Sequence, residues 1–393
     1  MSTPCELYKR YDKAVALTAR YVRARPNAGT SEMRLVTSCP TVMMAPMMGR
    51  LVFVCWLLSL ALEGAELERT NLMAYLDARG DVRPVRSVAD WGKRRAGVLE
   101  AMQRVMGPLP GKEKRCVLDV KVEEEMDRGG YKLQKLTYAS EPDGRVPAYL
   151  LIPKTASITN KAPAVLGLHQ THRLGNKVVV GLGDSPDDAY GVALAERGFV
   201  VLAPAYPLLA DYNPDLKALG YQSGTMKAIW DNIRGLDLLS SLPFVKTNRF
   251  GAIGHSLGGH NSVYTAAFDE RIKVVVTSCG LDSYRDYMDG SIKGWTSTRY
   301  MPKLLDYPLT EIPFDFHEMI GALAPRTCFI SAPLGDSNFK WKSVDAVATA
   351  ARQVYELYGA SDKLIVKHPD CPHRFPPEMR DEAYKIIEQT FRP

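Results

Sequence analysis

The amino-acid sequence predicts an α/β protein: a mostly parallel sheet with helices on both faces, preceded by an antiparallel meander. From residue 161 onward, short apolar runs alternate with helical patterns, which is typical of parallel sheets covered by helices. Before that point, three extended runs are separated only by turn sequences, which is typical of antiparallel strands joined as hairpins. With 393 residues, 46% of them hydrophobic, the chain is long enough to bury one large core.

The net charge of +6 comes mainly from the N-terminal segment. Residues 1–50 hold eight lysines and arginines against three acidic residues, which gives +5 and leaves +1 for the rest of the chain. That remainder has no basic stretch interleaved with aromatic residues, so we expect no nucleic-acid partner.

Residues 51–62 form an apolar stretch that is too short to cross a bilayer, which takes about 20 residues, but suits the core of a secretory signal. We therefore expect residues 47–65 to be a signal peptide, with translation starting at Met47 or Met48. Residues 1–46 would then be disordered or a spurious extension, and the protein would be secreted or periplasmic. A buried amphiphilic helix in a cytoplasmic protein, or a membrane anchor, is the alternative.

The expected globular domain covers residues 87–393 and begins with a helix over residues 87–106, which ends at Gly107 and Pro108. Strands are expected at residues 116–125, 131–138, 146–152, 164–168, 199–203, 250–253, 272–277, 327–331 and 364–366. The later helices are expected at residues 189–197, 224–242, 261–268, 343–358 and 377–391.

Residues 280–324 interrupt the alternation of strands and helices and are rich in aromatic residues. We expect a lid-like insertion that forms a wall of the substrate pocket, with Trp295 and Tyr300 as substrate-binding candidates. The alternative is a structural excursion that only covers the end of the sheet.

Residues 254–258 have the pattern Gly-x-Ser-x-Gly between an apolar strand and a helical run. This pattern in this context is typical of a nucleophile elbow, a sharp turn that exposes a serine hydroxyl at the end of a strand. Strand and helix approach so closely around such a serine that side chains at the two glycine positions would clash. Ser256 is therefore the candidate nucleophile.

A serine nucleophile needs a histidine base, and the base needs a carboxylate that fixes its tautomer. After a nucleophile elbow the expected chain order is serine, acid, histidine. Asp336 and His373 follow the last two predicted strands and are the candidates for acid and base. Asp282 is the rival acid and His368 the rival base.

His255 and His260 flank the candidate nucleophile, and we expect both to pack near it without taking part in catalysis. The oxyanion of an acyl-transfer intermediate also needs two backbone N–H donors. We expect one from Leu257, directly after the nucleophile, and the other from Gln170 in the loop after the strand at 164–168. A shift of this second donor by one residue stays open.

No metal or cofactor is expected, because the histidines form no His-Glu-x-x-His motif and no spaced cluster with cysteines. His368, Cys371 and His373 are too weak a trio to predict a metal site. No dinucleotide-binding or phosphate-binding glycine loop occurs. Four cysteines lie outside the leader and extension, and their disulfide pairing stays open: Cys116, Cys279, Cys328 and Cys371.

Three segments, Gly254–Gly259, Gly220–Asp231 and His368–Pro376, resemble the α/β-hydrolase superfamily, in particular its esterase and dienelactone-hydrolase-like branch with acetyl xylan esterase relatives. The resemblance runs from about residue 87 to the end. It implies an eight-stranded, mostly parallel sheet and a Ser256–Asp336–His373 triad. The usual His-Gly of the branch reads His169-Gln170 here, which puts the second oxyanion donor in question, and the cysteine nucleophile of dienelactone hydrolases is missing.

We therefore expect a serine carboxylic-ester hydrolase that cleaves short-chain acyl or carbohydrate-linked esters through an acyl-enzyme, without a cofactor and without stable insertion into a membrane. A serine peptidase or amidase of the prolyl-oligopeptidase type is the alternative within enzymes. A catalytically silent binding protein with the same fold is the alternative outside them.

Overall fold

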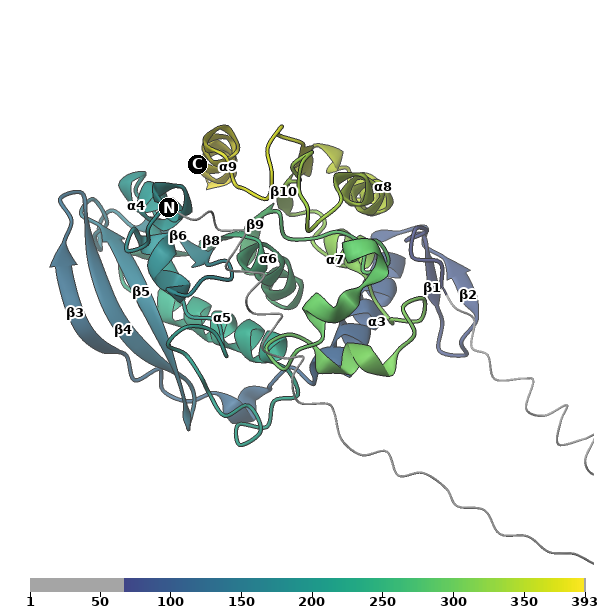
Figure 1. Cartoon of the computed structure of the whole chain (residues 1–393), viewed down its shortest axis with the longest axis horizontal. Coiled ribbons are helices and arrows are strands. Elements are labelled where there is room, and N and C mark those ends of the chain that lie inside the picture. Colours follow the sequence, from purple (N-terminus) through teal and green to yellow (C-terminus); the bar gives the residue numbers. More distant parts are fainter. Residues whose placement is uncertain (1–66, 392–393) are drawn as a thin grey trace, which may run out of the picture. The chain divides into compact units, whose positions relative to one another are not determined.

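The structure, a computed structural model, describes residues 67–391 (Figure 1). These residues belong to one compact unit that runs from Glu63 to Pro393. The expected signal peptide at 47–65 and the extension before it lie outside the described residues. Within the described range, no helix is both long and apolar enough to cross a membrane.

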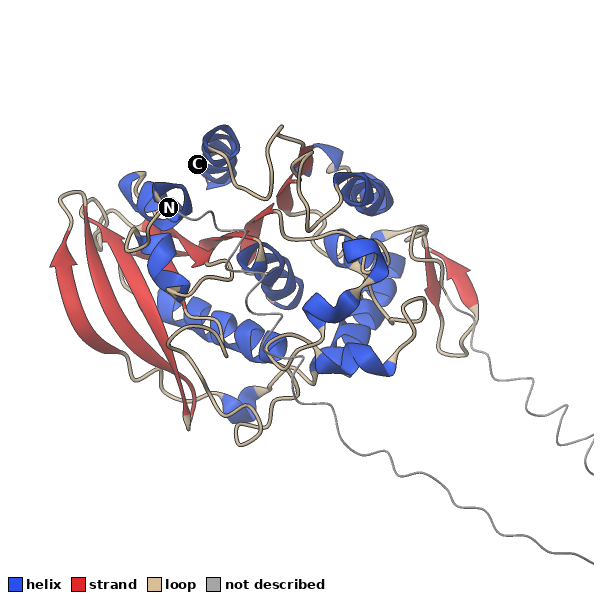
Figure 2. Cartoon of the chain, viewed as in Figure 1, coloured by secondary structure: helices blue, strands red, loops and turns tan. Residues whose placement is uncertain are grey.

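A nine-stranded sheet forms the centre of the unit (Figure 2). Its spatial order is β11-β10-β9-β8-β6-β7-β5-β4-β3. The strands are β3 (Lys121–Asp127), β4 (Tyr131–Glu141), β5 (Gly144–Pro153), β6 (Ala162–Leu168), β7 (Val200–Pro204), β8 (Val245–His255), β9 (Ile272–Ser278), β10 (Thr327–Ser331) and β11 (Leu364–Lys367).

The meander and the parallel part of the sheet are both present as expected. β3, β4, β5 and β7 pair antiparallel to one another, and β7, β6 and β8 to β11 pair parallel. The sheet has one strand more than the eight that the family resemblance implied. The nine expected strand ranges already include this number, and the expected strand at 116–125 overlaps β3, an edge strand with six exposed residues and one of intermediate burial.

Two helical layers cover the sheet (Figure 1). Helices α5 (Gly224–Ser241), α6 (Leu257–Phe268) and α8 (Trp341–Leu357) share one core with the sheet face that carries Leu166 and Ile330, and α3 (Val88–Met106) and α7 (Phe316–Gly321) extend that core. Helices α4 (Tyr190–Glu196) and α9 (Pro377–Phe391) pack on the opposite face, which carries Val165 and Phe329. Neighbouring strand residues therefore alternate between the two cores, as strand geometry requires.

Short elements account for most of what the sequence patterns did not predict. A hairpin of β1 (Ala74–Leu76) and β2 (Val82–Pro84) precedes the expected domain start, yet it belongs to the same compact unit. The 3₁₀ turns are η1 (Lys112–Lys114), η2 (Gly175–Val180), η3 (Pro186–Asp188), η4 (Tyr287–Gly290), η5 (Ile292–Trp295), η6 (Pro302–Asp306) and η7 (Ser361–Lys363).

Residues 280–324 contain η4, η5, η6 and α7 and pack tightly against the helical layer. Four aromatic side chains of this insertion are buried: Tyr284, Trp295, Phe314 and Phe316. The Tyr284 ring alone contacts the other three, with centroids 5.4 to 5.8 Å away. The aromatic content of the insertion therefore serves its own packing, and its role as a lid or pocket wall stays a prediction.

Candidate active site

Ser256 lies in a strained turn between β8 and α6. Its backbone has φ 52° and ψ −119°, a conformation that is uncommon for any residue other than glycine. Its N–H donates a hydrogen bond to the Ser278 carbonyl at 2.8 Å, which ties the turn to β9. Strained backbone of this kind is found where the surrounding structure imposes it, often at functional sites.

The glycines around Ser256 are required by close backbone approach. A Cβ on Gly254 would lie 2.2 Å from the carbonyl of Gly258, and a Cβ on Gly258 would lie 1.8 Å from the Leu168 carbonyl oxygen. The start of α6 therefore touches the end of β6. This contact brings the loop after β6 next to the turn that carries Ser256.

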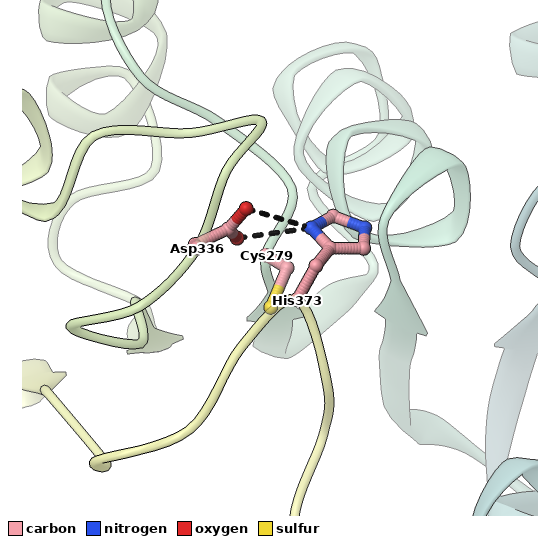
Figure 3. Close-up of side chains that lie close together, drawn as sticks. All are labelled: Cys279, Asp336 and His373. Carbon is pink, nitrogen blue, oxygen red and sulfur yellow. Dashed lines mark hydrogen bonds and ion pairs between the residues drawn. The ribbon is translucent and has the colours of Figure 1, made fainter. Parts of the chain in front are cut away.

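Asp336 and His373 meet across the loops that follow β10 and β11 (Figure 3). Both carboxylate oxygens of Asp336 accept from Nδ1 of His373, at 2.9 and 3.0 Å. The Asp336 side chain is 1% exposed and that of His373 is 23% exposed. Nδ1 therefore carries the proton, and Nε2, which points away from Asp336, is left as the acceptor in the neutral ring.

The Asp336 carboxylate is held in its charged form. Burial opposes ionisation, but the hydrogen bond and charge of His373 and two backbone donors outweigh it and lower the pKa of Asp336. Those donors are the N–H groups of Asn338 and Phe339, at 2.8 and 3.2 Å from Oδ1. The geometry is that of a carboxylate that orients an imidazole.

The rival candidates bond elsewhere. The Asp282 carboxylate accepts from the Lys340 N–H at 3.0 Å, and burial raises its pKa to about 8. His368 has both ring nitrogens engaged, with the Ala332 carbonyl at 2.8 Å and Asp345 at 2.9 Å. Neither side chain is bonded to His373 or to Ser256 among the described contacts.

His255 lies directly beside His373, with ring centroids 4.9 Å apart. Burial, followed by the neighbouring His373, lowers the pKa of His255 to about 3. The ring is therefore neutral at ordinary pH and bonds through Nδ1 with Ser278 Oγ at 3.2 Å. His255 packs against the candidate base without adding a positive charge to it.

The loop after β6 is fixed by His169. Nε2 of this buried imidazole accepts from the Tyr206 N–H at 3.0 Å, so Nδ1 carries the proton and donates to the Gln170 carbonyl at 2.8 Å. Burial lowers the pKa of His169 to about 4, which keeps this arrangement neutral. Gln170 itself is 8% exposed. The contact of α6 with β6 brings the loop after β6, which holds Gln170, towards Leu257. The roles of the Gln170 and Leu257 N–H groups as oxyanion donors stay predictions.

Trp295 and Tyr300 lie differently with respect to this site. Tyr300 reaches the loop after β6, because its hydroxyl is 3.3 Å from Thr171 Oγ1. Trp295 is 2% exposed and packs against His260 in a tilted arrangement, with ring centroids 4.7 Å apart. Tyr300 is partly exposed and Trp295 is buried, and the substrate-binding role of both stays a prediction.

Cys279 is the residue at this site that sequence reasoning missed. It follows β9 directly, is 2% exposed, and its Sγ lies within 4.8 Å of the side-chain ligand atoms of both Asp336 and His373 (Figure 3). The thiol donates to the Arg374 carbonyl at 3.3 Å. The sequence offered one indication of this position, because Cys279 lies two residues after the strand predicted at 272–277. All four described cysteines are free thiols.

Comparisons with known proteins agree with this architecture. Residues 218–359 match the family described as glucuronyl esterase, fungi. A hydrolase of Bacillus subtilis (strain 168), YtaP, is 25% identical over 307 residues, which cover 75% of this chain and 99% of the relative.

Two solved structures share the fold. A glucuronoyl esterase from Solibacter usitatus has a TM-score of 0.66 at 18% identity and covers 84% of this chain and 99% of its own. A Bacteroides fragilis protein assigned to the acetyl xylan esterases has a TM-score of 0.55 at 19% identity and covers 72% and 76%.

The chain therefore has the α/β-hydrolase fold, as the sequence motifs led us to expect. Together with the family match, the similarity identifies it as a carboxylic-ester hydrolase of the α/β-hydrolase superfamily. The acetyl xylan esterase likeness expected from the sequence is present, beside a likeness to glucuronoyl esterases that the sequence motifs had not suggested.

Proposed function

We propose that this protein hydrolyses carbohydrate-linked carboxylic esters, with Ser256 as nucleophile, His373 as general base and Asp336 as the residue that orients His373. The observation that carries the proposal is the Asp336–His373 pair, in which two carboxylate oxygens hold one ring nitrogen at 2.9 and 3.0 Å. Asp336 follows β10 and His373 follows β11, which lie on the same side of β8 in the sheet. Ser256 directly follows β8, so all three residues come after the carboxyl ends of parallel strands. Ligands of open α/β sheets bind at these strand ends.

The proposed reaction follows from the tautomer of His373. Because Nδ1 is protonated towards Asp336, Nε2 can take the proton from Ser256 Oγ as the oxygen attacks the ester carbonyl. The C–O bond to the alcohol then breaks, and the same proton leaves with the alcohol. A water molecule, deprotonated by Nε2 in turn, releases the acid and restores Ser256. Leu257 and Gln170 would donate to the oxyanion through their N–H groups.

The carbohydrate part of the proposal is supported by the aromatic insertion and by the relatives. The Phe339 ring lies between the candidate base and the aromatic insertion, with its centroid 5.9 Å from that of His373 and 6.2 Å from that of Trp295. Tyr300 adds a hydroxyl beside the loop after β6. Apolar ring faces with a few polar groups are typical of ligand pockets. The matched family is described as glucuronyl esterase, and the similar solved structures include a glucuronoyl esterase and a protein assigned to the acetyl xylan esterases.

The test compares four substrates on the wild type and the Ser256→Ala variant: p-nitrophenyl acetate, a benzyl ester of glucuronic acid, acetylated xylan and a p-nitroanilide amide. We expect turnover of at least one sugar ester and of p-nitrophenyl acetate by the wild type only. Preference for the amide would instead favour the peptidase alternative, and no turnover at all would favour the silent binding protein.

Tyr300→Phe adds a substrate-specific control, because it keeps the ring and removes one hydroxyl. Loss of a single hydrogen bond of about 1 kcal/mol predicts a roughly fivefold lower kcat/KM on the sugar ester. The rate on p-nitrophenyl acetate should change less. An equal fall in kcat/KM on both substrates would contradict a contact between the Tyr300 hydroxyl and the sugar.

We also propose that the protein is exported, on the basis of the apolar stretch at residues 51–62. Expression of the full chain in a secreting host, followed by intact-mass analysis, tests this. An exported product that begins near residue 66 would support cleavage of a signal peptide, whereas a cell-retained, uncut chain would contradict it.

A further inference from the structure

Three side chains of different chemistry converge beside the proposed base: Cys279, Asp336 and His373 (Figure 3). One sulfur, one carboxylate oxygen and one ring nitrogen lie within 4.8 Å of one another. Cys279 directly follows β9, and Asp336 and His373 lie in the loops after β10 and β11, so three adjacent strands lead to this group.

This set of atoms suits a borderline or soft divalent cation. Zinc binds cysteine sulfur at about 2.3 Å and histidine nitrogen or carboxylate oxygen at about 2.0–2.2 Å, with three protein ligands and one open position in many sites. Tetrahedral bonds of those lengths place the ligand atoms roughly 3.3–3.8 Å apart. A pair of ligand atoms at the 4.8 Å limit would need to approach by roughly 1–1.5 Å, whereas Nδ1 and the Asp336 oxygens, 2.9 and 3.0 Å apart, would separate slightly. A hard cation such as Mg²⁺ is disfavoured, because it prefers oxygen ligands only.

The hydrogen bonds of the Cys279 sulfur are long, and one of them comes from Ser278 Oγ, which donates to the sulfur at 3.7 Å. Cys279 bonds through its thiol to the Arg374 carbonyl at 3.3 Å, a long contact from a poor donor. The His373 side chain is 23% exposed, whereas Asp336 is 1% and Cys279 2% exposed, so a cation would enter from the His373 side. Its binding would exchange the thiol hydrogen bond and the hydrogen bonds between Nδ1 and Asp336 for bonds from the metal to sulfur, nitrogen and oxygen.

We propose that Cys279, Asp336 and His373 form an inhibitory site for a zinc-class divalent cation, which switches off the esterase by fixing the wrong tautomer of His373. The cation bonds to Cys279 Sγ, whose proton passes to solvent, to one oxygen of Asp336 and to Nδ1 of His373. The proton of Nδ1 moves to Nε2. No electron is transferred. The inhibitory effect rests on the proposed function, whereas the binding of the cation does not.

The consequence follows from the imidazole. With a cation on Nδ1 and a proton on Nε2, the ring has no lone pair left to accept the proton of Ser256. Cation binding and general-base catalysis by His373 are therefore mutually exclusive. A reversible inhibitor of this kind differs from a cation that merely reacts with exposed cysteines.

The activity test uses titrations with Zn²⁺, Cd²⁺ and Mg²⁺ on the wild type, Cys279→Ser and Cys371→Ser, each rate being compared with its own cation-free rate. Cys371 is the matched control, because its backbone carbonyl bonds Gly335 next to Asp336 while its own thiol is outside the group. We expect Zn²⁺ and Cd²⁺ to inhibit the wild type and Cys371→Ser alike, and EDTA to restore both.

Cys279→Ser should need at least about tenfold more cation for half-inhibition, since even the loss of a supporting partner of a metal ligand costs about 10–100-fold in affinity. Mg²⁺ should have no effect at the same concentrations. Equal sensitivity of Cys279→Ser and wild type, or loss of sensitivity in Cys371→Ser, would overturn the proposal.

A second readout is independent of activity. Cd²⁺ is added to Ser256→Ala, and the ultraviolet thiolate-to-cadmium charge-transfer absorption is followed. We expect one equivalent of Cd²⁺ to saturate the signal, and the signal to vanish in Ser256→Ala/Cys279→Ser but not in Ser256→Ala/Cys371→Ser. If the wild type lacked ester turnover while this pattern held, the proposed function would fail and the cation site would stand. Absence of the Cys279-dependent signal would refute the proposed cation site, whether or not the wild type hydrolyses esters.

Discussion

Replacement of Asp336 by asparagine should separate the two possible acids of the site. Asp336 Oδ1 accepts from the N–H groups of Asn338 and Phe339 at 2.8 and 3.2 Å, so the amide oxygen of an asparagine will keep that position. The NH₂ group then replaces Oδ2, which lies 3.0 Å from His373 Nδ1. Oδ1 also lies 2.9 Å from Nδ1, so the variant keeps one acceptor for the Nδ1 proton, replaces the other with a donor and removes the negative charge that stabilises the imidazolium.

The expected loss follows from the missing negative charge and from the N–H donor placed beside Nδ1, which weakens the hold on the catalytic tautomer. Asparagine in place of the acid of a serine triad lowers kcat by about 10,000-fold where this has been measured, so we expect a loss of about 1,000- to 10,000-fold in kcat/KM. That is about 4–5.5 kcal/mol of transition-state stabilisation. The assay is steady-state hydrolysis of p-nitrophenyl acetate, with thermal unfolding of each variant to show that it is folded.

Asp282→Asn is the matched control, because it changes the rival carboxylate in the same way. Its Oδ2 partner, the Lys340 N–H, can still be satisfied by an amide oxygen. We expect kcat/KM within about twofold of the wild type, as for a residue outside the reacting group. A severe loss in Asp282→Asn with retained activity in Asp336→Asn would refute the assignment and make Asp282 the acid.

Further predictions concern stability. Gly258→Ala should lower the free energy of unfolding by about 3 kcal/mol or more, because its Cβ would lie 1.8 Å from the Leu168 carbonyl oxygen. Gly92→Ala, in α3 with nothing within 4 Å, should instead raise it by about 0.5–1 kcal/mol, and equal denaturation midpoints for the two would contradict this. Burial raises the pKa of Asp282 to about 8 in the folded state, above its ordinary value of about 4, so the folded state holds the extra proton and the Asp282 contribution to stability falls as pH rises from about 4 to 8. Asp282→Asn should therefore gain stability over the wild type as pH rises through this range, and a constant difference in urea midpoints from pH 4 to 8 would count against the raised pKa.

The sequence predicted the elements that carry the site because each has a local signal. Ser256 lies between glycines that close backbone contacts require, and Asp336 and His373 each follow an apolar strand. Chain order then limited the choice to a few residues. The structure joins Asp336 to His373 and leaves Asp282 apart, a distinction that needs the positions of loops rather than strands.

Other features depend on contacts between distant segments and had no local signal. Lys227 and Asp231 form an i,i+4 pair that is typical of a solvated helix face, yet the Lys227 side chain is fully buried because Glu141 of β4 bonds it at 2.9 Å. Cys279 lies beside Asp336 and His373 only because β9, β10 and β11 are neighbours in the sheet. The packing of α5 against β4 decides the first and strand order the second, and periodicity encodes neither.

The central claim is that Ser256 is the nucleophile of an ester hydrolase. Incubation of the wild type with a fluorophosphonate, followed by intact-mass analysis, peptide mapping and an esterase assay on the same sample, tests it most directly. We predict one adduct per chain, located on Ser256, with ester hydrolysis lost in proportion to labelling and no adduct on Ser256→Ala. An adduct on a different residue, or full hydrolysis by a chain fully labelled at Ser256, would contradict the claim.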